Sequence, residues 1–243
     1  MRPAAGDGLR PPSLLRVTAR RSYIAGRFYL FYGIGISLIL ALALNFAKGS
    51  AFASAFPLFL PIFGIVGSLG AVMVFTNDRL KGVLEYLMAY GISPRGLFVQ
   101  TLLVTLLLSS IVLAVAIGVG LGLYLAMGNA LTVQLALALG VYAVPMCYAS
   151  CALACAIGMY WTALSSPRAG MNSPVGLIPL IGIIPPLIGV LLISVLAATG
   201  TFSGATATDV AAGILVLVIG VIAIVLVTFV GRLLDRERLL SPA

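Results

Sequence analysis

Long apolar runs without a single charged residue alternate with short polar segments along the whole chain. Six of these runs reach the roughly 20 residues that an α-helix needs to cross the hydrocarbon core of a bilayer. The runs are Phe28–Ala47, Ala53–Phe75, Leu97–Met127, Leu131–Leu164, Pro174–Thr199 and Val210–Gly231. The pattern therefore predicts an all-α membrane protein with six transmembrane helices, folded as a single domain over residues 1–243.

The basic segment before the first run has helical character. Arg16 and Arg20 are four residues apart, and Leu14 and Val17 add apolar surface. This pattern predicts an amphipathic interfacial helix over residues 13–27, with arginines at the lipid headgroups and apolar side chains below them. The alternative is a disordered basic leader that acts only on topology.

An apolar stripe at helical spacing lies in the polar segment between the second and third runs. Its residues fall at positions i, i+3, i+4, i+7 and i+8, namely Leu80, Val83, Leu84, Leu87 and Met88. Lys81 and Glu85 are four residues apart on the other side and can pair as ions. Asn77 is a suitable N-cap, and Gly91 lies where a left-handed C-terminal cap is expected. The segment thus predicts one helix over residues 77–91.

The next two residues predict the start of the third span. Ser93 is a second N-cap, and Pro94 occupies the first helical position, where its missing N–H is harmless. By its periodicity alone, the preceding helix fits either an amphipathic linker at the membrane interface or a docking element for a soluble partner.

Composition and charge favour a membrane protein with both termini in the cytoplasm. The chain is 62% hydrophobic and only 8% charged, whereas soluble domains carry about 25% charged residues. With six spans and cytoplasmic termini, every Lys and Arg except Lys48 lies on the cytoplasmic side, as the positive-inside rule requires. The net charge of +8 then indicates insertion into the cell membrane and contact with anionic lipids. Nucleic-acid binding is disfavoured, because the charges are scattered over several short segments.

The six runs contain no Asp, Glu, Lys or Arg, and the chain contains no His. Ionisable residues inside a membrane mark ion paths, proton relays and catalysis. Their absence counts against a proton-coupled carrier, an intramembrane metalloprotease and a hydrolase with a serine nucleophile and a histidine base. Sodium coupling stays open, because backbone carbonyls of broken helices can coordinate sodium. We expect no catalytic residue in this chain.

Two of the predicted spans carry prolines in their interior. Proline removes a helix hydrogen bond and clashes with the preceding turn. The fifth span is therefore expected to be kinked or partly unwound near Ile184–Leu187, and the fourth carries Pro145 in mid-helix. Functional hinges and merely packed kinks both fit this pattern.

Three cysteines and a methionine recur every four residues in the fourth run, at Cys147, Cys151, Cys155 and Met159. They share one face of a helix. Soft sulfur ligands would suit copper(I), but successive turns of one straight helix cannot bring three sulfurs onto one ion. Cysteine also serves as a small apolar residue at close helix contacts. This second interpretation is preferred, and neither a metal nor a cofactor is expected on this chain.

The segment between the second and third spans resembles the first cytoplasmic loop of ABC type-2 exporter permeases. Arg79, Gly82 and Glu85 stand in the pattern Arg-x-x-Gly-x-x-Glu, followed by an apolar stretch and Ile92-Ser93-Pro94-Arg95. Val83 replaces the Thr that is usual in this family. The plan of an amphipathic N-terminal helix, six spans and short external loops is also similar. The last external loop, Gly200–Asp209, is short and lacks the proline-rich re-entrant pair of several subfamilies.

The resemblance implies the transmembrane permease subunit of an ABC exporter. Residues 77–91 would be the coupling helix, with Glu85 as its polar anchor in a cleft of a separate ATPase subunit that binds ATP and Mg. The expected coupling residues are Arg79, Lys81, Gly82, Leu84, Glu85, Leu87 and Met88. A second permease copy or paralogue would complete a pore lined mainly by spans one, two and five.

An uncharged pore suits a hydrophobic or amphipathic substrate such as a drug or a lipid-like molecule. Residues expected along the path are Phe56, Phe59, Phe63, Gly182 and Gly189. Aromatic linings also stack on sugars, so glycan export stays open. The competing functions are an ion-coupled secondary carrier or channel without an ATPase and, least favoured, an intramembrane enzyme or an assembly protein.

Overall fold

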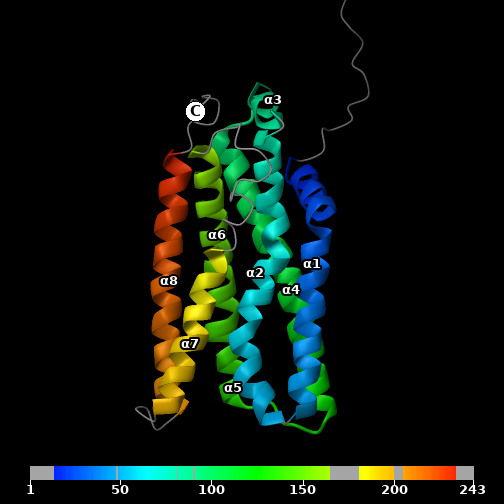
Figure 1. Ribbon diagram of the computed structural model, residues 1–243, viewed down its shortest axis with the longest axis vertical. Coiled ribbons are helices and arrows are strands. Elements are labelled where there is room, and N and C mark those ends of the chain that lie inside the picture. The colour runs from blue at the N-terminus through cyan, green and yellow to red at the C-terminus, as the bar shows by residue number, and fades with distance from the viewer. Residues whose placement is uncertain are drawn as a thin grey trace, which may run out of the picture.

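The structure is a computed structural model, and it describes residues 14–47, 49–80, 82–89, 91–164, 181–199 and 205–233. Within these ranges the chain forms one elongated bundle of helices that run along its long axis (Figure 1). The elements are α1 (Leu14–Ala47), α2 (Gly49–Leu80), α3 (Val83–Ala89), α4 (Pro94–Ala126), α5 (Val133–Leu137), the π-helical segment η1 (Ala138–Ala143), α6 (Val144–Leu164), α7 (Ile184–Thr199) and α8 (Ala205–Leu233).

Five stretches of helix are long and apolar enough to cross a membrane. They are Arg16–Phe46, Phe52–Phe75, Pro94–Ala126, Val133–Tyr160 and Ala212–Leu233. The described part of the chain contains no strand. The coarse prediction of a multi-pass, all-α membrane protein is therefore confirmed.

The fifth predicted span is not reproduced in full. Of Pro174–Thr199, residues 174–180 lie outside the described part of the chain. Residues 181–183 form a 3₁₀ turn, and the α-helix begins only at Ile184. Pro185 and Pro186 stand in its first turn, where a proline needs no hydrogen-bond partner. The 16 residues of α7 are fewer than the roughly 20 that a span requires, and in Figure 1 the helix occupies one half of the bundle.

The helix predicted over residues 13–27 is confirmed for residues 14–27, but it is continuous with the first span and not a separate element. Residues 14–27 are the first turns of α1, a single helix of 34 residues. Tertiary contacts explain this continuity, because α1 lies along α2 over much of its length. Gly26 meets Gly70 so closely that a Cβ on either would strike the other's Cα. The arginine-bearing turns therefore pack on a neighbouring helix.

The irregularity predicted around Pro145 takes the form of η1. Proline has no backbone N–H, so the carbonyl of Val141 receives no helix bond from Pro145. The turns just before it widen to π geometry, in which the N–H of Val144 donates to the carbonyl of Leu139, five residues back. Such single-turn π segments interrupt α-helices and are frequent at functional sites.

The core lies around α2, with α4 and α6 against it. Phe52 and Phe56 of α2 are fully buried and stack with ring centroids 4.6 Å apart, and Phe52 also stacks on Tyr124 of α4 at 5.1 Å. In contrast, α8 lies at the edge of the bundle (Figure 1) and exposes most of its apolar side chains. In a membrane these side chains face lipid or another protein.

Candidate functional site

The predicted helix over residues 77–91 is divided in two by Gly82. Asn77 lies within α2, which continues to Leu80, so its prediction as an N-cap is wrong. Gly82 adopts a φ of +70°, and α3 then starts at Val83. Residues with a side chain rarely adopt a positive φ, because their Cβ then clashes with the backbone. Glycine has no Cβ and so adopts this conformation without strain. The apolar periodicity runs through the break and so could not reveal it.

The apolar stripe of α3 packs onto the end of the bundle. Leu84 and Met88 are 2% and 1% exposed, respectively. They join a cluster that includes Phe75 of α2 and Phe98 of α4, and Leu87 packs against it. Leu84 and Met88 are thus buried against the bundle, and Leu87 is half-buried there. These contacts fix α3 at the same end of the molecule as the start of α1 and the end of α8 (Figure 1).

The corner after α3 forms as predicted. Gly91 has a φ of +85°, and its N–H donates to the carbonyl of Met88 at 3.1 Å. The N–H of Ile92 donates to the carbonyl of Leu87 at 3.2 Å, which completes a left-handed C-terminal cap. The hydroxyl of Ser93 accepts from the N–H of Gly96 at 3.0 Å, and α4 begins at the proline that follows.

The charged coupling residues lie largely outside the described part of the chain. Lys81 is outside it altogether, and only the backbones of Arg79 and Glu85 are described. Tyr86, which the sequence analysis did not select, is 62% exposed on α3. The signal in the sequence that could have identified Tyr86 is an aromatic residue next to the charged Glu85. The roles of Arg79, Lys81 and Glu85 in binding an ATPase stay a prediction.

An ion pair that the sequence did not predict links α1 to the end of α2. The guanidinium of Arg21 donates to the carboxylate of Asp78, whose side chain is only 9% exposed. Asp78 lies in the last turns of α2. Since the partners are 57 residues apart in sequence, only the packing of α1 on α2 could bring them together.

The predicted substrate-path phenylalanines differ in their surroundings. Phe56 is fully buried in the aromatic stack and has no surface open to a path in this conformation. Phe59 and Phe63 are half-buried. No contact of these residues tests a role in transport, which stays a prediction.

The two glycines of the predicted path are close helix contacts. A Cβ on Gly182 would meet Ala154 and, at 3.0 Å, the carbonyl oxygen of Ser150, both on α6. A Cβ on Gly189 would strike the hydroxyl of Tyr142 on η1. Both glycines thus hold residues 181–199 against the rest of the bundle.

The sulfur-bearing face of α6 points into the bundle as predicted. Cys147, Cys151, Cys155 and Met159 are all fully buried. The Sγ of Cys155 lies 3.8 Å from the Sδ of Met159, and a Cβ on Gly64 would strike the Sγ of Cys147. Among the described residues no group of three or more His, Cys, Asp or Glu side chains could hold a metal ion. The geometry favours close packing as the role of this face.

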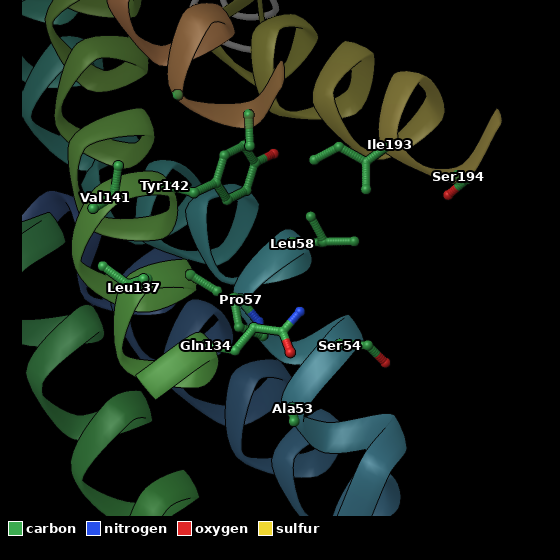
Figure 2. Close-up of a pocket in the computed structure, with 13 residues that line it drawn as sticks. Ala53, Ser54, Pro57, Leu58, Gln134, Leu137, Val141, Tyr142, Ile193 and Ser194 are labelled. Atoms are coloured by element: carbon green, nitrogen blue, oxygen red, sulfur yellow. The ribbon is translucent and has the colours of Figure 1, made fainter. Parts of the chain in front are cut away.

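A half-open cavity of about 390 Å³ is shown in Figure 2. Its lining includes α5, which lies at the opposite end of the bundle from α3 (Figure 1). The cavity is bordered by α2, α5, η1, α7 and α8. The described lining residues are Ala53, Ser54, Pro57, Leu58, Gln134, Leu137, Ala138, Val141, Tyr142, Ile193, Ser194, Ala212 and Gly213. Sequence patterns did not reveal this site, because its described residues come from four separate stretches of the chain and no stretch supplies more than five of them.

The hydroxyl of Tyr142 is buried at the wall of this cavity without a hydrogen-bond partner in the described structure. It points from η1 toward α7, in the direction of Ile193 (Figure 2). Most buried hydroxyls are paired, because an unpaired one costs about 1–3 kcal/mol. This hydroxyl oxygen is also the atom that a Cβ on Gly189 would strike.

This contact leads to a prediction about stability. We expect Gly189→Ala to lower the free energy of unfolding by about 1–3 kcal/mol, because the new methyl group meets the tyrosine oxygen. Tyr142→Phe alone should cost nothing, since no hydrogen bond is lost. In the double variant the methyl group has room, so most of the loss should be recovered. Thermal unfolding of the four proteins in detergent measures this, and an equal effect of Gly189→Ala in both backgrounds would contradict it.

The sequence matches no protein-family model, no curated protein and no solved structure.

Proposed function

We propose that this chain is the membrane-spanning permease subunit of an ATP-driven ABC exporter whose ATPase is a separate polypeptide. The observation that carries the proposal is α3, a seven-residue helix held across the end of a membrane bundle. Its apolar side is fixed by Leu84 and Met88, and positive-φ glycines bound it on both sides. A rigid, protruding element of this kind can receive force from a soluble partner.

The placement of basic residues supports a cytoplasmic location of this end. Arg16, Arg20 and Arg27 in the first half of α1, Arg95 at the start of α4 and Arg232 at the end of α8 lie at the same end as α3 (Figure 1). Basic residues accumulate on the cytoplasmic side of a membrane. The proposal therefore places both termini in the cytoplasm and the chain in the cell membrane.

The exposed apolar faces leave room for a second permease. In α1, Phe28, Phe31 and Phe46 are 59–74% exposed, whereas 67% of the apolar stretch of α2 is buried within the chain. Of the first two spans, both expected to line a pore between two copies, α1 thus offers the more open surface. We propose a hydrophobic or amphipathic substrate, because none of the described membrane-spanning stretches has a charged side chain in its central part.

Recovery of an ATPase tests the proposal. The first step is to look for a Walker-motif ATPase encoded next to the gene of this chain; if one is found, it is expressed with the tagged chain and the two are purified in mild detergent. We expect a stable complex, with the ATPase retained through a second purification step. Failure to retain any ATPase, together with solute movement that follows an ion gradient without ATP, would replace the proposal with the ion-coupled carrier.

A further inference from the structure

The cavity between α2, η1, α7 and α8 changes in polarity from its mouth to its interior. Gln134 is the second residue of α5, and Ser54 and Ser194 lie within about two turns of the helix ends at this end of the bundle. Leu58 is one turn further into α2 than Ser54, and Val141 is two turns beyond Gln134. Among these lining residues the polar side chains thus lie nearer the helix ends and the aliphatic ones lie deeper, with the buried hydroxyl of Tyr142 as the one polar group among the deeper residues named here.

Prolines remove two backbone hydrogen bonds along the same walls. Pro57 has no N–H to donate to the carbonyl of Ala53, and both residues line the cavity. Pro145 likewise has no N–H to donate to the carbonyl of Val141, which is another lining residue. In apolar surroundings a carbonyl released from its helix bond gains from any donor that reaches it. A hydroxyl or amide N–H on a ligand would be such a donor.

None of the described lining residues is charged. An ion inside would have no counter-charge, which burial in a membrane penalises strongly. The volume of about 390 Å³ falls within the usual range of roughly 300–1,000 Å³ for small-molecule sites. The volume of the cavity and its uncharged, partly polar lining together restrict the ligand to small uncharged molecules.

We infer that this cavity binds an uncharged amphiphile, with a hydrogen-bond donor on its polar end at the mouth and its apolar body directed inward. An uncharged membrane lipid and a foreign lipophilic alcohol share this chemistry. Binding requires only the chain itself, whereas the identification of the ligand as transported cargo rests on the proposed function.

Binding is measured with 1-pyrenebutanol, a fluorescent uncharged alcohol, on the full-length chain in lipid nanodiscs without any ATPase. We expect a saturable component above that of empty nanodiscs. The methyl ether of the probe, which has no donor, should bind about three- to tenfold more weakly, as expected for the loss of one net hydrogen bond. Displacement by monooleoylglycerol would identify a lipid as an accepted ligand, and displacement only by compact alcohols would identify the foreign class.

Two glycines of α8 provide a matched pair of variants. A Cβ on Gly213 or on Gly220 meets no atom within 4 Å, so both accept a larger side chain without strain. Only Gly213 lines the cavity. Gly213→Leu should therefore weaken binding of the probe tenfold or more, while Gly220→Leu changes it less than twofold.

A third variant addresses the backbone acceptor. Pro57→Ala returns an N–H to the carbonyl of Ala53, so it should weaken binding of the alcohol and leave binding of the ether unchanged. Equal binding by Gly213→Leu and Gly220→Leu would overturn the site, and equal binding of alcohol and ether by the parent would overturn the ligand class. Recovery of an ATPase is scored separately, so the proposed function can fail while the cavity still binds the probe.

Discussion

Glu85→Ala is expected to leave the chain folded and inserted while it weakens binding of the ATPase subunit at least about 30-fold. The change leaves Leu84 and Met88, which anchor α3, untouched. Loss of a charged contact at a desolvated interface costs about 2–5 kcal/mol, and about 1.4 kcal/mol corresponds to tenfold in affinity. The dissociation constant of the complex in detergent, measured for variant and parent, checks this expectation.

Asp209→Ala is the matched control for this experiment. Asp209 is also acidic and lies near the start of α8, at the opposite end of the bundle from α3 (Figure 1). We expect it to bind the ATPase as tightly as the parent does. Thermal unfolding of both variants should match that of the parent. Equal affinity of Glu85→Ala and the parent would remove Glu85 from the proposed interface.

The second large effect concerns the crossing of α1 and α2. Gly26→Ala should lower the free energy of unfolding by about 3 kcal/mol, the upper end of the range for overpacking. The added methyl group would fall on the backbone of Gly70, at the Cα and, at 3.3 Å, at its N and C atoms. A flexible side chain could move aside, but two helix backbones can separate only by giving up their contacts on either side.

Gly35→Ala on the same helix should have the opposite effect. No atom lies within 4 Å of a Cβ at this position, and alanine is better than glycine in a helix interior by about 0.5–1 kcal/mol. Thermal or denaturant-induced unfolding in detergent compares the two variants. Similar shifts for Gly26→Ala and Gly35→Ala would show that α1 and α2 do not meet at Gly26 and Gly70 as described.

Four of the six predicted spans lie close to helical stretches that are long and apolar enough to cross a membrane. The apolar runs in α2, α4, α6 and α8 are long and charge-free, and local composition decides such cases because a bilayer accepts little else. Gly91 and Ser93 were also predictable, since a left-handed cap and an N-cap depend on single residue types. Burial of Leu84 and Met88 followed from helical spacing.

Local patterns failed where a distant part of the chain decides the conformation. The first turns of α1, which carry the arginines, contact Gly70 and Asp78 of α2. The pattern of residues 13–27 alone contains no information about these contacts. The break at Gly82 was hidden because glycine permits both a helix and a positive φ, and the surroundings select one of them.

The sequence by itself thus determined the membrane class, the ends of several helices and the apolar side of α3, because each depends on residues close together in the chain. The tertiary structure decided the Arg21–Asp78 ion pair, the crossing at Gly26 and the cavity around Gln134 and Tyr142. Each of these joins residues from helices far apart in sequence. Periodicity identifies which side of a helix is apolar, but not which helix packs against it or where two packed helices leave a space.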